Sequence, residues 1–427
     1  MIPTIGRAAL TQTAIDSVLC QQGITDFEII VADCAVGSAV EEAVRSLNDQ
    51  RVIYRKTPDG DPSLGWDFAF QQASGDYFIW LDDDNYLLPH ALRTLDAVIA
   101  ATGAEIVTGH HVYYYDSLYV RPDRRRTLGV TRFDGSATAI DPLVAMKSVV
   151  SFTTGAREQP YRFHPAATAF SRRLGERATA RLGHVVLPRQ WCNHSLQPIL
   201  FGLAKSCVGI SVPLSIVGRY GVSLTQTFNT GEKRRARPVR PIHFSPVHGD
   251  IYRNHVADAY FAVINALQPE LAGITVSLPN FLDRYARELF FGDMPLAVMH
   301  PLWEELATVA AGLPETDRNQ ILPTVRRLRR AAAMVQPLKT FGWWSSLRAL
   351  YRYLQKWSGR DRRRIPGATS ETLVRLAPYG IADVRTLVSR VPELVRAITG
   401  QDLLAAADEA IRAARRLHLK PSAPVGV

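Results

Sequence analysis

The stretch from Tyr77 to Pro89 reads YFIWLDDDNYLLP, and it gives the clearest indication of the fold. Apolar residues from Tyr77 to Leu81 run directly into three consecutive aspartates, Asp82 to Asp84. A short continuous apolar run is typical of a strand that is buried on both faces. Two unit charges about 4 Å apart repel by roughly 4 kcal/mol at an effective dielectric near 20. The sequence therefore predicts a compensating partner for the carboxylates at this strand end.

The first hundred residues alternate between strand-like and helix-like segments. The run FEIIVADC (Phe27 to Cys34) is strand-like and contains Asp33 near its end, and Ala9 to Gln21 has apolar residues at helical spacing. This alternation predicts a parallel sheet with helices on both faces. Ligands of such sheets bind at the carboxyl ends of the strands. We therefore expect Asp33 and the aspartates from Asp82 to Asp84 to lie at one edge.

Magnesium and manganese prefer oxygen ligands, and magnesium takes only one or two protein carboxylates beside water and substrate phosphates. Adjacent acids at a strand end therefore fit a metal–diphosphate complex, in which the cation would offset the repulsion. The alternative interpretation of DDD by itself is a solvated acidic turn. The preceding strand, the stop at Pro89 and the second aspartate at Asp33 favour the functional interpretation.

The composition is that of a globular protein with one large domain and smaller additions, since 47% of the 427 residues are hydrophobic and 21% are charged. No window holds eighteen uninterrupted apolar residues, and no secretory signal is recognisable. We therefore expect a cytoplasmic protein. The four cysteines form no C-x-x-C pair and are expected to be reduced thiols.

Several motifs in order resemble the family-two glycosyltransferases of GT-A fold. They are PTIGR (Pro3 to Arg7), FEIIVADC, GWDFAFQQASGDYFIWLDDDNYLLP and PLSIVGR, and the resemblance covers roughly residues 1 to 225. It implies a Rossmann-like α/β domain with a mostly parallel sheet, followed by an all-α C-terminal region. The expected division is a GT-A domain over 1–230, a helical extension over 231–340, a basic amphipathic linker over 341–364 and a helical module over 365–420.

The resemblance also implies a donor site. The residues expected to contact the donor nucleotide are Pro3, Thr4, Arg7, Asp33, Trp66, Asp67 and Asp83. In the family, the aspartate that matches Asp33 accepts a hydrogen bond from uracil, which implies a UDP-sugar donor. Trp66 and Asp67 stand where many relatives have an arginine and an asparagine. Trp66 either packs beside the nucleobase or belongs to the core.

The acidic cluster can be aligned with the family in two ways that differ by one position. Against relatives that read T-D-D-N, Asp83 contacts the ribose or the metal and Asp84 holds the metal. Against D-x-D relatives, Asp82 and Asp84 are the metal-binding pair. Asp84 is common to both alignments, and the implied cofactor is Mn²⁺ or Mg²⁺.

Inverting transfer to a hydroxyl needs a general base, because a neutral hydroxyl is a poor nucleophile at pH 7. The family's base is generally an aspartate shortly before the P-L-x-x-x-G strand. This chain has Asn193 followed by His194 at that place. Because an amide takes no proton at neutral pH, either His194 acts, or an acid such as Glu158 acts, or transfer is slow or absent.

The net charge of +10 belongs to the C-terminal third, since Val325 to Arg364 contains twelve Lys and Arg against one acid, Asp361, and the rest of the chain is about neutral. The segment Phe341 to Trp357 combines arginines with tryptophans and leucines. We expect residues 325–364 to contact an anionic membrane surface or nucleic acid, or to pack on the catalytic domain. Residues Ile365 to Leu417 resemble a helix-hairpin-helix module, which implies DNA binding, protein interaction or oligomerisation. Its turn, PGATS, lacks the second glycine of DNA-binding members.

The sequence thus predicts a metal-dependent, inverting glycosyltransferase that uses a nucleotide-sugar donor, in the cytoplasm or at a membrane surface. The acceptor is left open among a saccharide, a lipid-linked glycan, a protein and a nucleic acid. Two alternatives remain. One is a nucleotide-sugar-binding protein whose catalysis has lapsed, and the other is a sugar transferase directed to nucleic acid.

Overall fold

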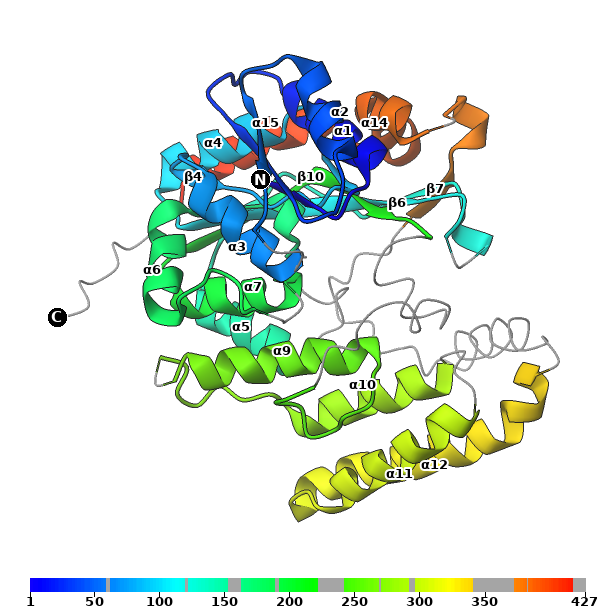
Figure 1. The fold of residues 1–427 in the computed structure, drawn as a ribbon. Helices are drawn as coiled ribbons and strands as arrows, with labels where there is room; N and C mark the ends of the chain where they lie inside the picture. Colours follow the sequence, from blue (N-terminus) through cyan, green and yellow to red (C-terminus); the bar gives the residue numbers. More distant parts are fainter. Residues whose placement is uncertain are drawn as a thin grey trace.

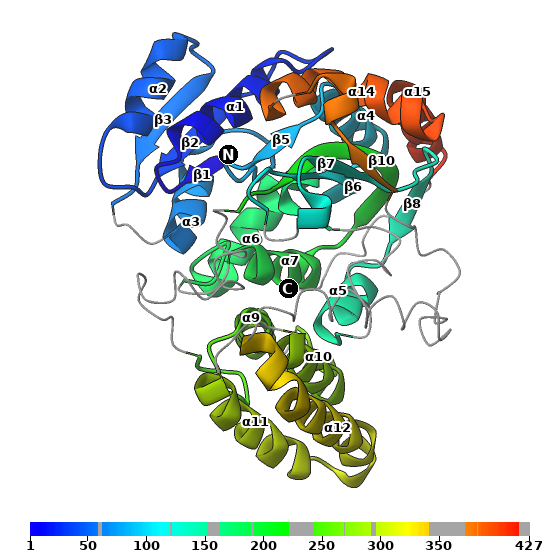
Figure 2. The ribbon, with the colours of Figure 1, turned by 90° about the vertical axis from the view of Figure 1, so that its right-hand side faces the viewer.

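The computed structural model describes residues 1–58, 62–119, 122–152, 163–188, 192–221, 242–268, 270–291, 296–340, 372–381 and 383–417. The chain forms an α/β body that carries a helical lobe on one side (Figure 1). Figure 2 shows the same division after a quarter turn, with helices α9 to α12 gathered below the body. The site predicted from the sequence lies within the α/β body.

The N-terminal part forms a small parallel sheet. Within the described residues it has three strands in the order β1-β2-β3, namely β1 (Ile2–Thr4), β2 (Ile29–Asp33) and β3 (Val52–Lys56). Its helices are α1 (Ala8–Leu19), α2 (Ala39–Leu47) and α3 (Pro62–Gln72). Register places Thr4 beside Asp33, and Asp33 beside Lys56. Three polar side chains therefore meet at the carboxyl edge of the parallel sheet that the alternation predicted.

A larger mixed sheet follows, and β10 lies at its centre. The strands found in the described residues are β4 (Tyr77–Phe78), β5 (Asn85–Leu87), β6 (Ile106–Tyr115), β7 (Thr127–Val130), β8 (Ala137–Ile140), β9 (Thr168–Ser171), β10 (Cys207–Arg219) and β11 (Thr372–Arg375). The main order is β11-β7-β6-β10-β5. Strand β10 runs parallel to β6 and antiparallel to β5 and β8. The sheet is therefore less parallel than the apolar runs suggested.

The predicted strand before the aspartates is wrong in its extent. Strand β4 ends at Phe78, and the chain then runs beside the N-terminus, where the Leu81 amide donates to the Met1 carbonyl across 2.9 Å. Asp82 to Asn85 form a tight turn, hereafter the acidic turn, in which the Asn85 amide donates to the Asp82 carbonyl across 2.9 Å. The carboxylates thus project from a turn between two strands, because the chain must reverse into β5.

Helices cover both faces of the larger sheet (Figure 1). One face packs on α1, α4 (Ala91–Thr102), α14 (Val384–Thr399) and α15 (Leu403–Arg415). The other packs on α3, α5 (Pro142–Val150), α6 (Arg172–Leu182) and α7 (Cys192–Leu203). Short 3₁₀ turns lie at Pro122–Arg124, Pro165–Ala167 and Ala377–Tyr379. The core therefore has two layers, one on each side of the sheet.

The helical lobe contains α9 (Tyr252–Ala266), α10 (Leu278–Phe291), α11 (Leu296–Ala311) and α12 (Glu315–Thr340). Apolar residues at helical spacing on α12 face α10 and α11, and those buried are Ile321, Val325, Leu328 and Ala332. Helix α9 joins the lobe to the body by packing on α7. The lobe and the body share one core for this reason.

The C-terminal segment returns to the α/β body. Residues Thr372–Arg375 were expected within a helical module, but they form β11, which pairs antiparallel with β7. Helices α14 and α15 then pack against α1 and α4, with ion pairs of 2.8 Å from Arg385 to Asp16 and 3.0 Å from Arg93 to Asp408. The segments 341–364 and PGATS lie outside the described residues, and the predicted domain boundaries stay predictions. The fold class, an α/β domain followed by a helical C-terminal region, is confirmed.

Candidate active site

Arg7 neutralises part of the negative charge of the acidic turn. Its Nε atom donates to Asp83 across 3.1 Å, its second guanidinium nitrogen also contacts Asp83, and its third lies 3.1 Å from an oxygen of Asp84. Thr4 adds a hydrogen bond of 2.7 Å from its hydroxyl to Asp83. The side chain of Asp83 is only 2% exposed, so such a carboxylate needs these donors. The first motif thus neutralises charge that the sequence had assigned to a metal alone.

Asp82 is the carboxylate of the turn for which no contact with Arg7 is found in the described part of the chain. Its Oδ2 atom accepts one hydrogen bond, from the side-chain Nδ2 of Asn85 across 3.2 Å. Burial, together with the charges of Asp84 and Asp83, raises the pKa of Asp82 to about 8. Burial raises the pKa of Asp84 to about 6 against the opposing effect of Arg7. Both acids would be more readily ionised beside a further cation.

The acidic turn offers a small oxygen ligand set for a divalent cation. Within the described residues, no cluster of three or more His, Cys, Asp or Glu side chains is placed to bind a metal. Asp83 is committed to Arg7 and Thr4, whereas Asp84 shares one oxygen with Arg7 and Asp82 one with Asn85. Asp84 and Asp82 therefore fit a hard cation that takes two carboxylates and completes its shell with water and substrate oxygens.

Asp33 lies at the end of β2 and is 1% exposed. Its Oδ2 atom accepts hydrogen bonds from the Tyr54 hydroxyl across 3.0 Å and from the Lys56 ammonium across 3.1 Å, and its Oδ1 accepts from the Ala35 amide. Neither Tyr54 nor Lys56 was predicted from the sequence. The signal was available, because Lys56 ends the neighbouring parallel strand and is the register partner of Asp33.

Trp66 and Asp67 have structural roles in this fold. Trp66 is 5% exposed and stacks on Trp80, with ring centroids 5.6 Å apart, so its indole belongs to the core. Asp67 is 4% exposed and accepts hydrogen bonds from the Val185 amide and from Gln71 and His184. Core packing holds the Trp66 side chain and three donors hold the Asp67 carboxylate, and a contact of either residue with the donor nucleotide stays a prediction. Pro3 lies buried within β1.

Strand β10 approaches the acidic turn through Gly218. Its amide donates to the Asp84 carbonyl and to Oδ1 of Asn85, each across 3.1 Å. A Cβ atom at this position would overlap the Asp84 carbonyl oxygen, so the close approach requires glycine. The next residue is Arg219, whose guanidinium lies over the Tyr113 ring at 4.8 Å. The motif PLSIVGR therefore ends next to the acidic turn.

His194, at the start of α7, is partly buried. Its Nε2 atom lies 2.8 Å from the Tyr252 hydroxyl, and the charges of Arg253 and Arg219 add to burial in lowering the pKa of His194 to about 3. Neighbouring His164 has its pKa lowered to about 3 by burial, Arg219 and His194. Both imidazoles are therefore neutral at pH 7. Asn193 lies in α7, but its side chain and Glu158 fall outside the described residues.

Comparison with known families identifies the N-terminal part of the chain. Residues 1–164 match the model of "Glycosyl transferase family 2". This stretch includes the first motif, Asp33 and the acidic turn, and it is a glycosyltransferase domain of that family. The predicted recognition of a family-two, GT-A-type domain is confirmed, whereas the helix-hairpin-helix resemblance stays a prediction.

One similar protein is the GalNAc(5)-diNAcBac-PP-undecaprenol beta-1,3-glucosyltransferase of Campylobacter jejuni subsp. jejuni serotype O:2. It is 36% identical over 103 residues, which is 22% of this chain and 32% of that enzyme. The chain thus matches about a third of the length of this relative. Its name describes transfer of glucose to an undecaprenol-linked acceptor.

Among solved structures, S. aureus TarS 1–349 in complex with UDP-GlcNAc aligns with a TM-score of 0.48 and 13% identity, over 78% of this chain and 90% of that one. S. aureus TarS aligns with a TM-score of 0.47 and 14% identity, over 77% and 52% of the two chains. Likeness at this level says nothing about donor or acceptor.

Proposed function

We propose that this protein is a glycosyltransferase that moves a sugar from a nucleotide-sugar donor, a UDP-sugar, to a hydroxyl acceptor. The observation that carries the proposal is the convergence of two other family motifs, PTIGR and PLSIVGR, on the acidic turn. Arg7 and Thr4 bond to Asp83, and β10 bonds to Asp84. Because these segments are distant in sequence, their convergence favours a shared site over a solvated turn.

The proposed UDP preference rests on Asp33. A buried carboxylate at the end of β2 can accept the imide N–H of uracil, and each carboxylate oxygen has two acceptor sites. Oδ1 of Asp33 accepts only the Ala35 amide among the described residues, at 3.0 Å. Tyr54 and Lys56 hold the other oxygen and fix the orientation of the carboxylate. This arrangement supports recognition of a uridine base.

The proposed cofactor is Mn²⁺ or Mg²⁺, held by Asp84 with help from Asp82. Such a cation, when bound, supplies positive charge that stabilises a departing diphosphate. Arg7 holds Asp83 and one oxygen of Asp84, which fixes the position of the turn. The chain itself thus sets the geometry of the ligands before the donor binds.

Among the side chains that the structure describes, His194 is the candidate for the general base of inverting transfer. Its imidazole is neutral at pH 7 and can accept a proton, although its lowered pKa of about 3 makes it a weak base. Negative charge from a bound diphosphate would oppose the effect of Arg219 and Arg253 and so raise that pKa. Asn193 and Glu158 remain the alternatives from the sequence. A lapsed, binding-only protein is the second candidate function, favoured by Asn193 in place of the family's aspartate.

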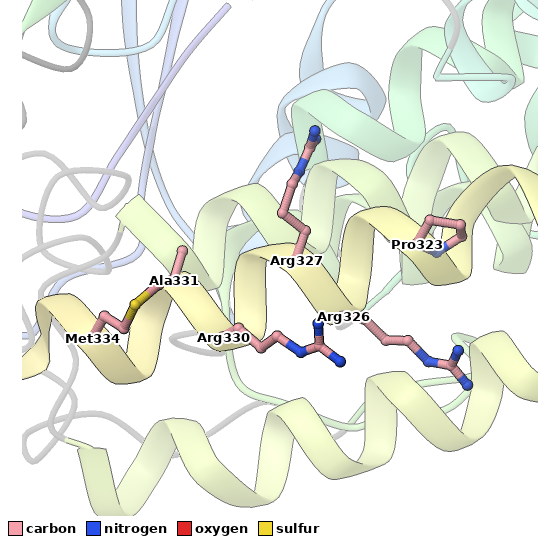
Figure 3. A pocket seen from close by; sticks show the side chains of 6 residues that line it. All are labelled: Pro323, Arg326, Arg327, Arg330, Ala331 and Met334. Atoms are coloured by element: carbon pink, nitrogen blue, oxygen red, sulfur yellow. The ribbon is translucent and has the colours of Figure 1, made fainter.

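We also propose that the lobe contacts an anionic membrane surface, as a lipid-linked acceptor would require. Helix α12 presents Arg326, Arg327 and Arg330 on its exposed side, next to Met334, which is 72% exposed. These residues line a groove of about 540 Å³ with Pro323 and Ala331 (Figure 3). Among the described residues, no helix is long and apolar enough to cross a bilayer. Oligomerisation and nucleic-acid contact gain no support from the described residues or the relatives.

The donor-site proposal is tested by isothermal titration of UDP in the presence and absence of Mn²⁺. We expect metal-dependent binding by the wild type and its loss in Asp84→Asn. Equal binding by the variant would overturn the assignment of Asp84. Screening nucleotide sugars for hydrolysis then separates an active transferase from a lapsed binding protein.

A further inference from the structure

The turn that joins β6 to β7 lies beside the end of β10. Register pairs Tyr115, the last residue of β6, with Arg219 of β10 and with Thr127 of β7. The Asp116 amide then donates to the Arg219 carbonyl across 3.2 Å. The turn therefore stands at the same edge of the sheet as the acidic turn, and it projects at the right-hand end of the sheet in Figure 1.

Strand β11 brings a further arginine to this edge. Arg375 ends β11, and register places it beside Thr127 at the start of β7. The amide of the next residue, Leu376, donates to the Arg126 carbonyl across 3.1 Å. Arg125, Arg126 and Arg375 thus lie at one end of two paired strands, and all three are exposed. These three residues are hereafter the basic edge.

The backbone of the basic edge is held in an unfavourable conformation. Arg126 has a φ of 53°, in the left-handed region that residues other than glycine rarely adopt. The hydrogen bond from Leu376 holds its carbonyl, and the Thr127 hydroxyl donates to the Arg124 carbonyl across 2.6 Å. Leu376 is itself 2% exposed and belongs to the core. Such strain persists only where the surrounding structure enforces it, and it is commonest at functional sites.

The charges of the basic edge are not compensated by acids. Within the part of the chain that the structure describes, no carboxylate lies at ion-pair distance from Arg125, Arg126 or Arg375. The turn contains two acids, Asp116 and Asp123, and neither pairs with these arginines. Guanidinium groups without a carboxylate partner have donors left for an anion.

The basic edge is too far from the acidic turn for one diphosphate to reach both. The sheet order β11-β7-β6-β10-β5 separates β7 and β11 from β5, which follows the acidic turn directly. Because neighbouring strands lie about 4.8 Å apart, the basic edge stands roughly 14–19 Å from the acidic turn. A diphosphate is shorter than this. An anion at the basic edge is therefore a different group from the donor diphosphate proposed at the acidic turn.

We propose that the basic edge binds a phosphate or diphosphate group of the acceptor, so that the acceptor is a phosphate-bearing molecule. This inference rests on the proposed function. Guanidinium groups suit the role because their planar donors match phosphate oxygens in pairs. The reacting hydroxyl of the acceptor then points along the sheet edge toward the acidic turn. The enforced backbone of Arg126 fixes the donors before the acceptor binds, which lowers the entropy cost of binding.

The test titrates the full chain with inorganic pyrophosphate in metal-free buffer, where the acidic turn has no cation with which to hold an anion. The double variant Arg125→Gln/Arg375→Gln should bind pyrophosphate about tenfold or more weakly than the wild type, because two charge-assisted partners are lost. The control double, Arg396→Gln/Arg415→Gln, removes the same charge from exposed positions on α14 and α15. Its affinity should stay within about threefold, since distant exposed charges are screened.

Arg126→Gly separates the side chain from the backbone conformation. Glycine adopts a φ of 53° without strain, so the urea midpoint should stay close to that of the wild type. Pyrophosphate affinity should still fall by about threefold to tenfold, because the guanidinium is lost. Lower stability with unchanged affinity would show that Arg126 serves only the fold and would overturn its assignment.

Two further probes identify the source of the phosphate. They are farnesyl diphosphate in phosphatidylcholine vesicles and glucose-1-phosphate in solution. A loss of affinity for the first in the double variant supports a lipid-borne phosphate, and a loss for the second supports a soluble one. Unchanged affinity for both, with a loss confined to phosphatidylglycerol vesicles, would overturn the proposal in favour of a membrane surface.

The remaining outcomes separate this inference from the proposed function. Unchanged pyrophosphate affinity in the double variant overturns the inference. An equal loss of UDP affinity, measured with Mn²⁺ on the same samples, also overturns it, because the arginines would then belong to the donor site. If the wild type binds pyrophosphate but not UDP with Mn²⁺, the proposed function fails and the acceptor assignment falls with it, while the anion site stands.

Discussion

The Nε atom of Arg7 lies 3.1 Å from Oδ2 of Asp83, which joins residues 76 positions apart in the sequence. The pair brings the first motif of the chain onto the acidic turn and neutralises part of its charge. It also separates the three aspartates by role. Asp83 is a structural partner of Arg7, and Asp84 and Asp82 keep oxygen atoms for other ligands.

Removing Arg7 should destabilise the fold. Arg7→Met leaves the buried Asp83 without its ion-pair partner, and breaking such a pair costs roughly 2–4 kcal/mol when one partner keeps some exposure, as Arg7 does at 24%. Urea unfolding at pH 7 measures the loss. In the double variant with Asp83→Asn, much of the stability should return, because no unpaired charge remains. Additive losses in the double variant would show that the two side chains do not interact.

The acidic turn should make stability depend on pH. The pKa of Asp82 is raised from its ordinary 3.8 to about 8, so the folded state holds its proton more strongly than the unfolded state. Its contribution to stability is therefore complete below about pH 4 and is lost as the pH rises toward 8. Wild type should lose stability relative to Asp82→Asn over this range. Urea midpoints at pH 5.5, 6.5, 7.5 and 8.5 check the difference between the two proteins.

A parallel dependence of both proteins on pH would contradict the raised pKa of Asp82. The comparison with Asp82→Asn is needed because His164 and His194 act in the opposite sense. Their lowered pKa values add stability as the pH rises from about 3 through 6.5, and they do so equally in both proteins.

Gly218→Ala should displace the acidic turn, since the new Cβ atom would overlap the Asp84 carbonyl oxygen. We expect metal-dependent UDP binding to weaken by at least tenfold, because small shifts of metal ligands have large effects on affinity. Gly312→Ala is the control, as its nearest contact would be an ordinary 3.6 Å. Titration calorimetry measures the UDP affinity of both variants. Equal affinities would show that the close approach of Gly218 to Asp84 does not position the metal ligands.

His194→Ala should lower the rate of sugar transfer by 10²–10⁴-fold if His194 is the base, in line with the usual contribution of general-base catalysis. UDP affinity should stay within about threefold of the wild type, because His194 has no assigned contact with the nucleotide. Tyr252→Phe, which removes the hydroxyl 2.8 Å from Nε2, should have a smaller effect on rate. Initial rates and titrations on the same samples give the transfer rate and the UDP affinity. An unchanged rate would show that His194 is not the base and would favour Glu158.

The basic face of α12 should bind anionic vesicles. Replacing Arg326, Arg327 and Arg330 with glutamine should reduce co-sedimentation with phosphatidylglycerol vesicles, by roughly 1 kcal/mol per arginine removed. Zwitterionic vesicles should bind neither protein. The control triple is Arg396, Arg412 and Arg415 to glutamine, which removes the same charge from α14 and α15. Equal losses in both triples would show that only net charge matters.

The sequence by itself determined the α/β class, and it brought the motifs of the proposed donor site into one domain. Continuous apolar runs such as IIVAD form β2 as predicted, and its Asp33 ends at the carboxyl edge. Local apolar pattern is sufficient here, because the faces of a parallel strand are both buried. The ordered motifs around Asp83 likewise lie within the matched domain, and the donor site that they define stays a prediction.

Only the tertiary structure decided which charges meet. Arg7 pairs with Asp83 and Asp84, Lys56 with Asp33, and Gly218 admits β10 to the turn. These contacts join segments distant in the chain. Burial, which sets the pKa of Asp82 and sends Trp66 into the core, likewise depends on all neighbours in space and not on local pattern. For the same reason, β11 could not be foreseen, since it forms only where β7 offers an open edge.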